Sequence, residues 1–411
     1  MKWINTPDDV IGYAITYIKV YLEKPAAVFS ELKGFADIVY IPKKPSEKPA
    51  MIIELKYDKS AEGAIAQIKE KRYVESLKEY QGNMLLVGIN YDKMTKTPLT
   101  KLIVSLGIPT TISMLVTNIY NMVDTYFVGT LGESQQAATG ILFTLQAIIQ
   151  AIAFMLGQGS GTLVSKSLAE QDQEEASEYV STAFFSGLVI GSILMVGGLL
   201  FLNPFMRLLG STETILPYAR QYGACVLITC PVMIGSIVIN NNLRYEGKAF
   251  YSMIGLVSGG LLNIFGDYLF VVVFQMGVLG AGLATAISQS ISFIILLYFF
   301  RKMAQSRIGL GAVSRELSVY GTISKIGFPA VIRQGLSSIS SGLLNNLTKP
   351  YGDAAIAAMS IVNRFAAFIM CVGLGIGQGF QPVASFNYQA GEYKRVKNLK
   401  RGEIYLADLL K

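Results

Sequence analysis

The stretch YLFVVVFQMGVLGAGLATAISQSISFIILLYFF, residues 268–300, lies between Asp267 and Arg301 and contains no charged side chain. A helix needs about 20 consecutive, mostly apolar residues to cross the hydrocarbon core of a membrane. Uncharged stretches of sufficient length recur in the chain, between Glu133 and Lys166 and between Glu178 and Arg207. This pattern predicts a mainly α-helical integral membrane protein.

Charge is distributed unevenly along the 411 residues. Charged residues make up 15% of the chain, whereas a soluble globular chain carries about 25%. Charges are frequent and alternate in sign as far as Lys96, and from Thr97 onward long runs have none. The chain contains no histidine, which excludes His-based catalysis and His metal ligation. The three cysteines lie inside apolar spans, which argues against a disulfide framework: Cys225, Cys230 and Cys371.

The part of the chain after Lys96 contains about eight predicted spans. They are centred on residues 100–123, 136–158, 180–205, 217–240, 250–275, 279–300, 317–346 and 354–378. The net charge is +7, and basic residues gather after the sixth and eighth spans, where the positive-inside rule places the cytoplasm. We therefore expect a multi-pass protein of the plasma membrane with a cytoplasmic N-terminus.

An internal repeat relates spans one and two to spans seven and eight. Gly107-x-Pro109 recurs as Gly327-x-Pro329, and Gly157-Gln158-Gly159 recurs without a gap as Gly377-Gln378-Gly379. The repeat unit is therefore six spans, a recurrent plan in transporters whose substrate passes between two halves. We expect a first lobe over 97–316 and a partial second lobe over 317–411. Twelve spans would complete the plan, so we expect a truncated chain or a fusion product.

The N-terminal part, residues 1–96, has the pattern of a small α/β domain. We expect strands over Phe35–Ile41, Ala50–Lys56 and Met84–Ile89, with a helix over Ser60–Tyr80. Asp37 lies on the first strand, and strand alternation puts Glu54 and Lys56 on one face of the second. Two carboxylates such as Asp37 and Glu54 can hold Mg²⁺ for phosphodiester hydrolysis, with Lys56 positioning the nucleophile. Gln67 and Tyr73 on the following helix would support this site. Solvated strand charges are an equally strong interpretation.

Several motifs after residue 97 resemble the multidrug and toxic compound extrusion (MATE) transporters. They are NMVDTYFVGTLG at 121–132, LRYEGK at 243–248, LLNIFGDYLF and GVLGAGLATAISQ within 261–289, and GQGFQPVASFNYQAGEYKRV at 377–396. The resemblance implies a two-lobed, twelve-helix antiporter. Such a protein exports cationic or amphiphilic compounds across the bilayer against inward Na⁺ or H⁺, and no obligate protein partner is implied.

Two carboxylates are the candidate coupling residues of the first lobe. Asp124 lies at membrane depth, where a charge is costly and is often functional, and its repeat partner is Leu344. Asp267 and Asn263 are one helical turn apart and face the same way. The resemblance implies that Asp267 and Asn263 join Asp124 in one polar cluster, and that Thr285 and Tyr222 belong to it. A hydrogen-bonded structural cluster is the alternative. For Arg333 and Arg364 we expect a structural role.

Residues 33–96 resemble PD-(D/E)XK nuclease domains, which belong to the restriction-endonuclease-like fold. The matching motifs are GFADIVYIP at 34–42, MIIELK at 51–56, AIAQIKEKRY at 64–73 and LLVGINYDK at 85–93. The resemblance implies a metal-dependent nuclease that acts on DNA. Two alternatives to an antiporter therefore stay open, a nuclease tethered to a membrane anchor and a non-functional chimera.

Overall fold

The computed structural model describes residues 38–40, 50–57, 84–91, 93–348 and 353–398. Side chains are not described in the strands or over most of residues 337–367. The chain divides into two compact units, Met1–Lys96 and Thr97–Lys411.

The first unit contains a three-stranded sheet in the order β1-β2-β3. Its strands are β1 Ile38–Tyr40, β2 Ala50–Tyr57 and β3 Met84–Tyr91, and the short helix α3 Lys93–Lys96 follows. β1 pairs with β2 antiparallel, with Ile38 opposite Ile53. β2 pairs with β3 in parallel, with Glu54 opposite Gly88. The three predicted strands are therefore present, and the predicted helix over Ser60–Tyr80 lies outside the described residues.

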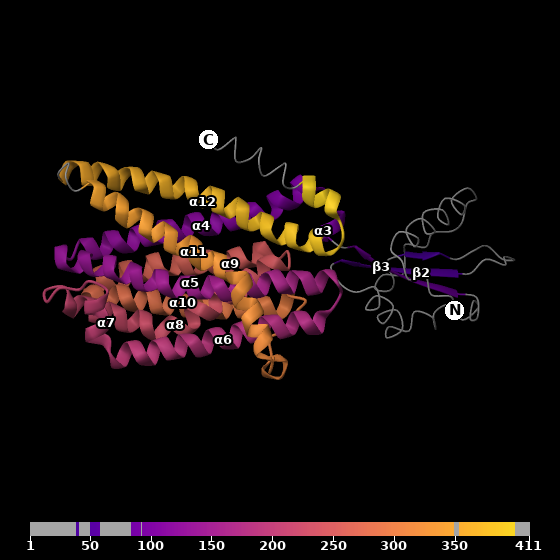
Figure 1. Cartoon of the computed structure of the whole chain (residues 1–411), viewed down its shortest axis with the longest axis horizontal. Coiled ribbons are helices and arrows are strands. Elements are labelled where there is room, and N and C mark those ends of the chain that lie inside the picture. The colour runs from indigo at the N-terminus through magenta and orange to yellow at the C-terminus, as the bar shows by residue number, and fades with distance from the viewer. Residues whose placement is uncertain (1–37, 41–49, 58–83, 92, 349–352, 399–411) are drawn as a thin grey trace. The chain divides into compact units, whose positions relative to one another are not determined.

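The second unit is a bundle of long helices that run roughly parallel to one another (Figure 1). Seven helical segments among the described residues are long and apolar enough to cross a membrane, and they include six of the predicted spans and the second half of the eighth. The elements are α4 Leu99–Gly129, α5 Glu133–Ala169, α6 Gln173–Leu200, α7 Leu202–Leu208, α8 Leu216–Tyr245, α9 Ala249–Asp267, η2 Tyr268–Val273, α10 Gly277–Met303, η3 Leu310–Ala312, α11 Leu317–Thr348 and α12 Asp353–Gln389.

The predicted seventh span also forms a helix, α11. Its described part contains Lys325 and Arg333, and it is not among the seven segments that meet the membrane-crossing criteria. The predicted third span ends earlier than expected. The helix breaks at Phe201, whose backbone leaves the α-helical region, and α7 begins one residue later. Several helices extend beyond the predicted spans, and α5, for example, continues to Ala169.

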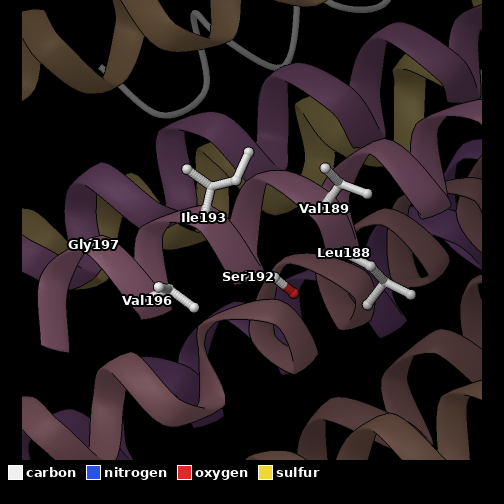
Figure 2. A pocket seen from close by; sticks show the side chains of 6 residues that line it. All are labelled: Leu188, Val189, Ser192, Ile193, Val196 and Gly197. Carbon is white, nitrogen blue, oxygen red and sulfur yellow. The ribbon is translucent and has the colours of Figure 1, made fainter. Parts of the chain in front are cut away.

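The outer face of α6 shows how the bundle meets its solvent. Val189 and Ile193 are 59% and 65% exposed, and with Leu188 and Val196 they line a shallow apolar groove (Figure 2). A patch of this kind on a soluble protein would favour aggregation, whereas lipid tails can cover it in a bilayer. By contrast, α8 is buried over most of its length among α5, α6 and α10.

Close glycine contacts join helices α4 and α5 to helices α11 and α12. A Cβ atom on Gly159 of α5 would overlap the carbonyl oxygen of Ile323 on α11, and one on Gly327 of α11 would overlap the carbonyl oxygen of Met155 on α5. A Cβ atom on Gly379 of α12 would lie 2.6 Å from the Cα atom of Gly107 on α4. The repeated glycines therefore allow the helix backbones of the two lobes to touch, as small residues do in membrane bundles.

Candidate functional site

Four helices bring the predicted coupling residues of the first lobe together. The hydroxyl of Tyr222 on α8 donates to Asp124 Oδ2 on α4 over 2.9 Å. The same hydroxyl lies 3.2 Å from Thr285 Oγ1 on α10, and Asn263 Nδ2 on α9 donates to that Thr285 oxygen over 3.3 Å. The hydroxyl of Tyr222 therefore connects the carboxylate of Asp124 to the rest of the cluster.

Asp267, the fifth predicted residue, lies at the end of α9. Its side chain is fully buried, and it lies close enough to Asp124 and Tyr222 to interact with them electrostatically. Neither of its carboxyl oxygens has a hydrogen-bond donor in the described part of the chain. The π-helical turn η2 begins at the next residue, and π-helical turns inside α-helices often occur at functional sites.

Small residues allow these helices to approach closely enough to form the cluster. On α9, Gly260 packs against Tyr120 and Val116 of α4, and Gly266 packs against Ala284 of α10. On α10, Gly282 packs against Tyr222 and Cys225 of α8. Each of these positions has no room for a larger side chain without a shift of its neighbours. Glycines on α9 and α10 therefore allow the helices that surround the carboxylates to pack close together.

The cluster contains buried oxygen atoms that have no donor. Within the described residues, one oxygen of Asp124, the amide oxygen of Asn263 and both oxygens of Asp267 lack a hydrogen-bond partner. An unpaired buried polar atom costs about 1–3 kcal/mol, and two neighbouring buried carboxylates repel each other when both are ionised. A proton or a hard cation such as Na⁺ would relieve both penalties, because hard cations prefer oxygen ligands.

A cavity of about 900 Å³ lies between the first lobe and helices α11 and α12. The residues of the cluster that line it are Asp124, Tyr222, Asn263 and Thr285. Asp267 is fully buried and is not among the lining residues. Most other polar groups on its wall are uncharged amides and hydroxyls, and the apolar part includes Phe154, Met233, Leu256 and Met370. The cavity is thus large enough for a drug-sized molecule and adjoins the carboxylate cluster.

The cavity wall also contains two arginines, Arg244 of α8 and Arg333 of α11. Arg244 is buried and donates to Gln378 Oε1 of α12 and to Asn241 Oδ1. Neither arginine was expected at a binding surface. Arg244 gave no signal apart from its place in the LRYEGK motif, because its contact with Gln378 joins residues that are far apart in the chain.

The predicted nuclease site falls largely outside the described residues. Asp37 and Gln67 are not described, and Glu54 and Lys56 are described only as backbone positions on β2. Within the described residues no group of three or more Asp, Glu or Cys side chains is arranged to hold a metal ion. The Mg²⁺ site with Asp37 and Glu54 therefore stays a prediction, and so does the nuclease alternative.

Comparisons with known proteins match both units. A family described as MatE matches residues 109–269 and 329–410, and the PD-(D/E)XK nuclease superfamily matches residues 16–100. The Multidrug export protein MepA of Staphylococcus saprophyticus is 28% identical over 306 residues, which cover 74% of this chain and 68% of that protein. MepA of Staphylococcus aureus is 26% identical over 311 residues, 75% of this chain and 69% of that protein.

Solved structures resemble the second unit. One is described as the outward-facing conformation of a multidrug resistance MATE family transporter of the MOP superfamily. It has a TM-score of 0.73 and 25% identity, over 77% of this chain and 71% of that one. A MATE structure in the straight conformation has the same TM-score and identity, over 77% of this chain and 72% of that one.

Proposed function

This chain belongs to the MatE family, and we propose that it is a secondary transporter that exports amphiphilic drugs in exchange for inward Na⁺ or H⁺. Multidrug export is the activity named for its MepA relatives. The observation that carries the coupling part of the proposal is the set of unpaired carboxyl oxygens on Asp124 and Asp267. In one conformation of the transporter an ion can bind these carboxyl oxygens, and in another conformation the same oxygens can be exposed to water.

The position of the cluster supports exchange between ion and drug. Asp124 faces the inter-lobe cavity and is bonded to Tyr222, so its charge state alters the cavity wall directly. A ligand shifts a conformational equilibrium only by its differential affinity for the two states. An ion held by Asp124 and Asp267 and a drug held in the cavity would favour different arrangements of the same helices.

The lobe contacts support an outward-open arrangement. The Gly107–Gly379 and Gly159–Gly327 contacts lie near the start of α4 and in the second half of α5. With the N-terminus on the cytoplasmic side, as the positive-inside rule predicts, both contacts lie toward the cytoplasm. They would close that side of the cavity while the drug leaves on the other.

The test is ion-driven drug movement by the full chain in proteoliposomes. One coupled cation moving down 100 mV supplies about 2.3 kcal/mol, enough for a roughly fifty-fold drug gradient. Asp124→Asn keeps the shape of the side chain but cannot carry the charge, so the gradient should collapse. Glu133→Gln removes an exposed carboxylate at the start of α5 and serves as the matched control. A wild-type chain that moves no drug, or an Asp124→Asn variant that retains the full gradient, would contradict the proposal.

A further inference from the structure

We propose that Arg333 and Arg244 form an anion-binding subsite on the wall of the inter-lobe cavity, and that the exported amphiphile carries a carboxylate that binds there. This inference depends on the proposed function and refines its substrate class. It assigns a binding role to an arginine for which the sequence predicted only a structural one.

Arg333 is the first reason for the inference. It lies near the middle of α11, half-buried, with its side chain on the cavity wall. Among the described residues no carboxylate forms an ion pair with it. Each end of α11 lies roughly 23 Å away at 1.5 Å per residue. A charge at such a position is costly unless it is paired or faces a water-filled cavity. The guanidinium of Arg333 lines the cavity and has no ion-pair partner among the described residues.

Arg244 is the second reason, because its side chain is held in place. Its two terminal nitrogens donate to Gln378 and Asn241, while its Nε has no acceptor among the described residues. Arg333 lies close enough to interact with it electrostatically. Two like charges near one another in a partly buried site repel, and a bound anion would remove that penalty. A fixed guanidinium also loses little side-chain entropy when it binds.

The charge balance of the wall indicates how many negative charges the ligand carries. Among the described residues that line the cavity, Asp124 is the acidic one, and Arg244 and Arg333 are the basic ones. With Asp124 ionised the wall carries one net positive charge, which a single carboxylate neutralises. Nearby apolar side chains such as Phe154, Met233 and Leu256 would contact the body of the ligand. A carboxylate-bearing amphiphile matches this combination.

The experiment compares two fluorescent ligands that differ in one group. The first is an aminoxanthene dye with a free benzoate, and the second is the methyl ester of the same dye. Equilibrium binding to the purified full chain in lipid nanodiscs is measured by fluorescence anisotropy. The wild-type chain should bind the benzoate dye about tenfold more tightly than the ester, the usual gain from a hydrogen bond to a charged group.

Variants then assign the preference to Arg333. Arg333→Gln should abolish the preference by weakening binding of the benzoate dye about tenfold, with the affinity for the ester unchanged. Arg333→Lys should retain part of the preference, because it keeps the charge but loses the planar pair of donors. Lys325→Gln removes an exposed positive charge from the same helix and should leave both affinities unchanged.

The possible outcomes separate this inference from the proposed function. Equal binding of both dyes by the wild-type chain would overturn the anion subsite and leave drug binding intact, and this comparison does not depend on whether any variant folds. An equal loss of both dyes in Arg333→Gln, in a variant with wild-type thermal stability, would also overturn it. If the wild-type chain binds neither dye, the proposed drug cavity fails as well.

Discussion

At the scale of the residue, the hydroxyl of Tyr222 holds the cluster together. It is buried, donates to Asp124 and lies within hydrogen-bond distance of Thr285. Without it the facing oxygen of Asp124 would join the atoms that have no donor. The geometry of the carboxylate cluster therefore depends on a neutral hydroxyl as well as on the carboxylates.

Tyr222→Phe should lower the free energy of unfolding by about 1–3 kcal/mol, because it leaves a buried carboxylate oxygen unpaired. Thermal unfolding of the purified chain measures this loss. Tyr126→Phe is the matched control, since Tyr126 is on the same helix as Asp124, is 69% exposed, and should melt as the wild type does. Equal melting temperatures for the two variants would show that the Tyr222 hydroxyl is not needed.

At this scale the sequence identifies those residues whose energetic cost in the membrane depends only on the neighbouring sequence. Asp124 is conspicuous because a carboxylate in an apolar run is costly, and Asp267 and Asn263 are linked by helical spacing. Tyr222 and Thr285 could be assigned only through the family resemblance, because tyrosines and threonines are common in apolar spans. For Arg333 the sequence predicts a structural role, and the anion-binding role inferred above depends on which side chains surround it, which helix packing decides.

At the scale of the element, a buried carboxylate fastens the turn after α8 to the segment that follows α10. Glu246 accepts hydrogen bonds from the backbone N–H groups of Gln305 and Ser306 and from the Ser306 hydroxyl. The side chain is almost fully buried. These bonds connect the two loops that precede α9 and α11, and so fix the end of the first lobe.

The stability contributed by Glu246 should fall as pH rises. Burial raises the pKa of the Glu246 carboxyl above its ordinary value, although the hydrogen bonds from Ser306 and Gln305 and the charge of Lys248 oppose this. Between the ordinary pKa of about 4.3 and the raised one, the folded chain holds a proton that the unfolded chain has released. The free energy of unfolding therefore decreases with increasing pH in that window.

Glu246→Gln should remove this pH dependence, because glutamine keeps an acceptor oxygen and does not titrate. Melting temperatures measured across the window for the variant and the wild type provide the test, and the difference between the two curves isolates Glu246 from other groups. Parallel curves would exclude a contribution from this carboxyl.

Helices were easier to predict than their ends. Apolar runs located the long helices of the described residues because the hydrocarbon core requires apolar side chains over its full thickness, and α11 was located although it contains Lys325 and Arg333. The break at Phe201 and the π-turn after Asp267 could not be foreseen, because both arise from backbone adjustments within continuously apolar sequence. The extensions beyond the spans lie where polarity no longer distinguishes helix from loop.

At the scale of the whole molecule, the glycine contacts determine how closely the lobes approach. Gly327→Ala should destabilise the chain by about 1–3 kcal/mol, the usual cost of an overpacked interface, because the new methyl group meets the Met155 backbone. Gly321→Ala on the same helix has open space around it and should stabilise the chain by up to about 1 kcal/mol through helix propensity. Thermal unfolding should therefore shift in opposite directions, and a shift in the same direction would contradict a tight lobe contact.

The repeated glycines also bear on the ancestry of the fold. Under the 220-residue offset Gly107 corresponds to Gly327 and Gly159 to Gly379, so the α4–α12 contact and the α5–α11 contact are copies of each other. A symmetric dimer makes such contacts in pairs, because residue i of one subunit meets residue j of the other and the reverse. A single-lobe ancestor would have formed both contacts from one pair of glycines. In such an ancestor every substitution at this interface would act twice, whereas in one fused chain each copy can diverge, as the pair Asp124 and Leu344 illustrates.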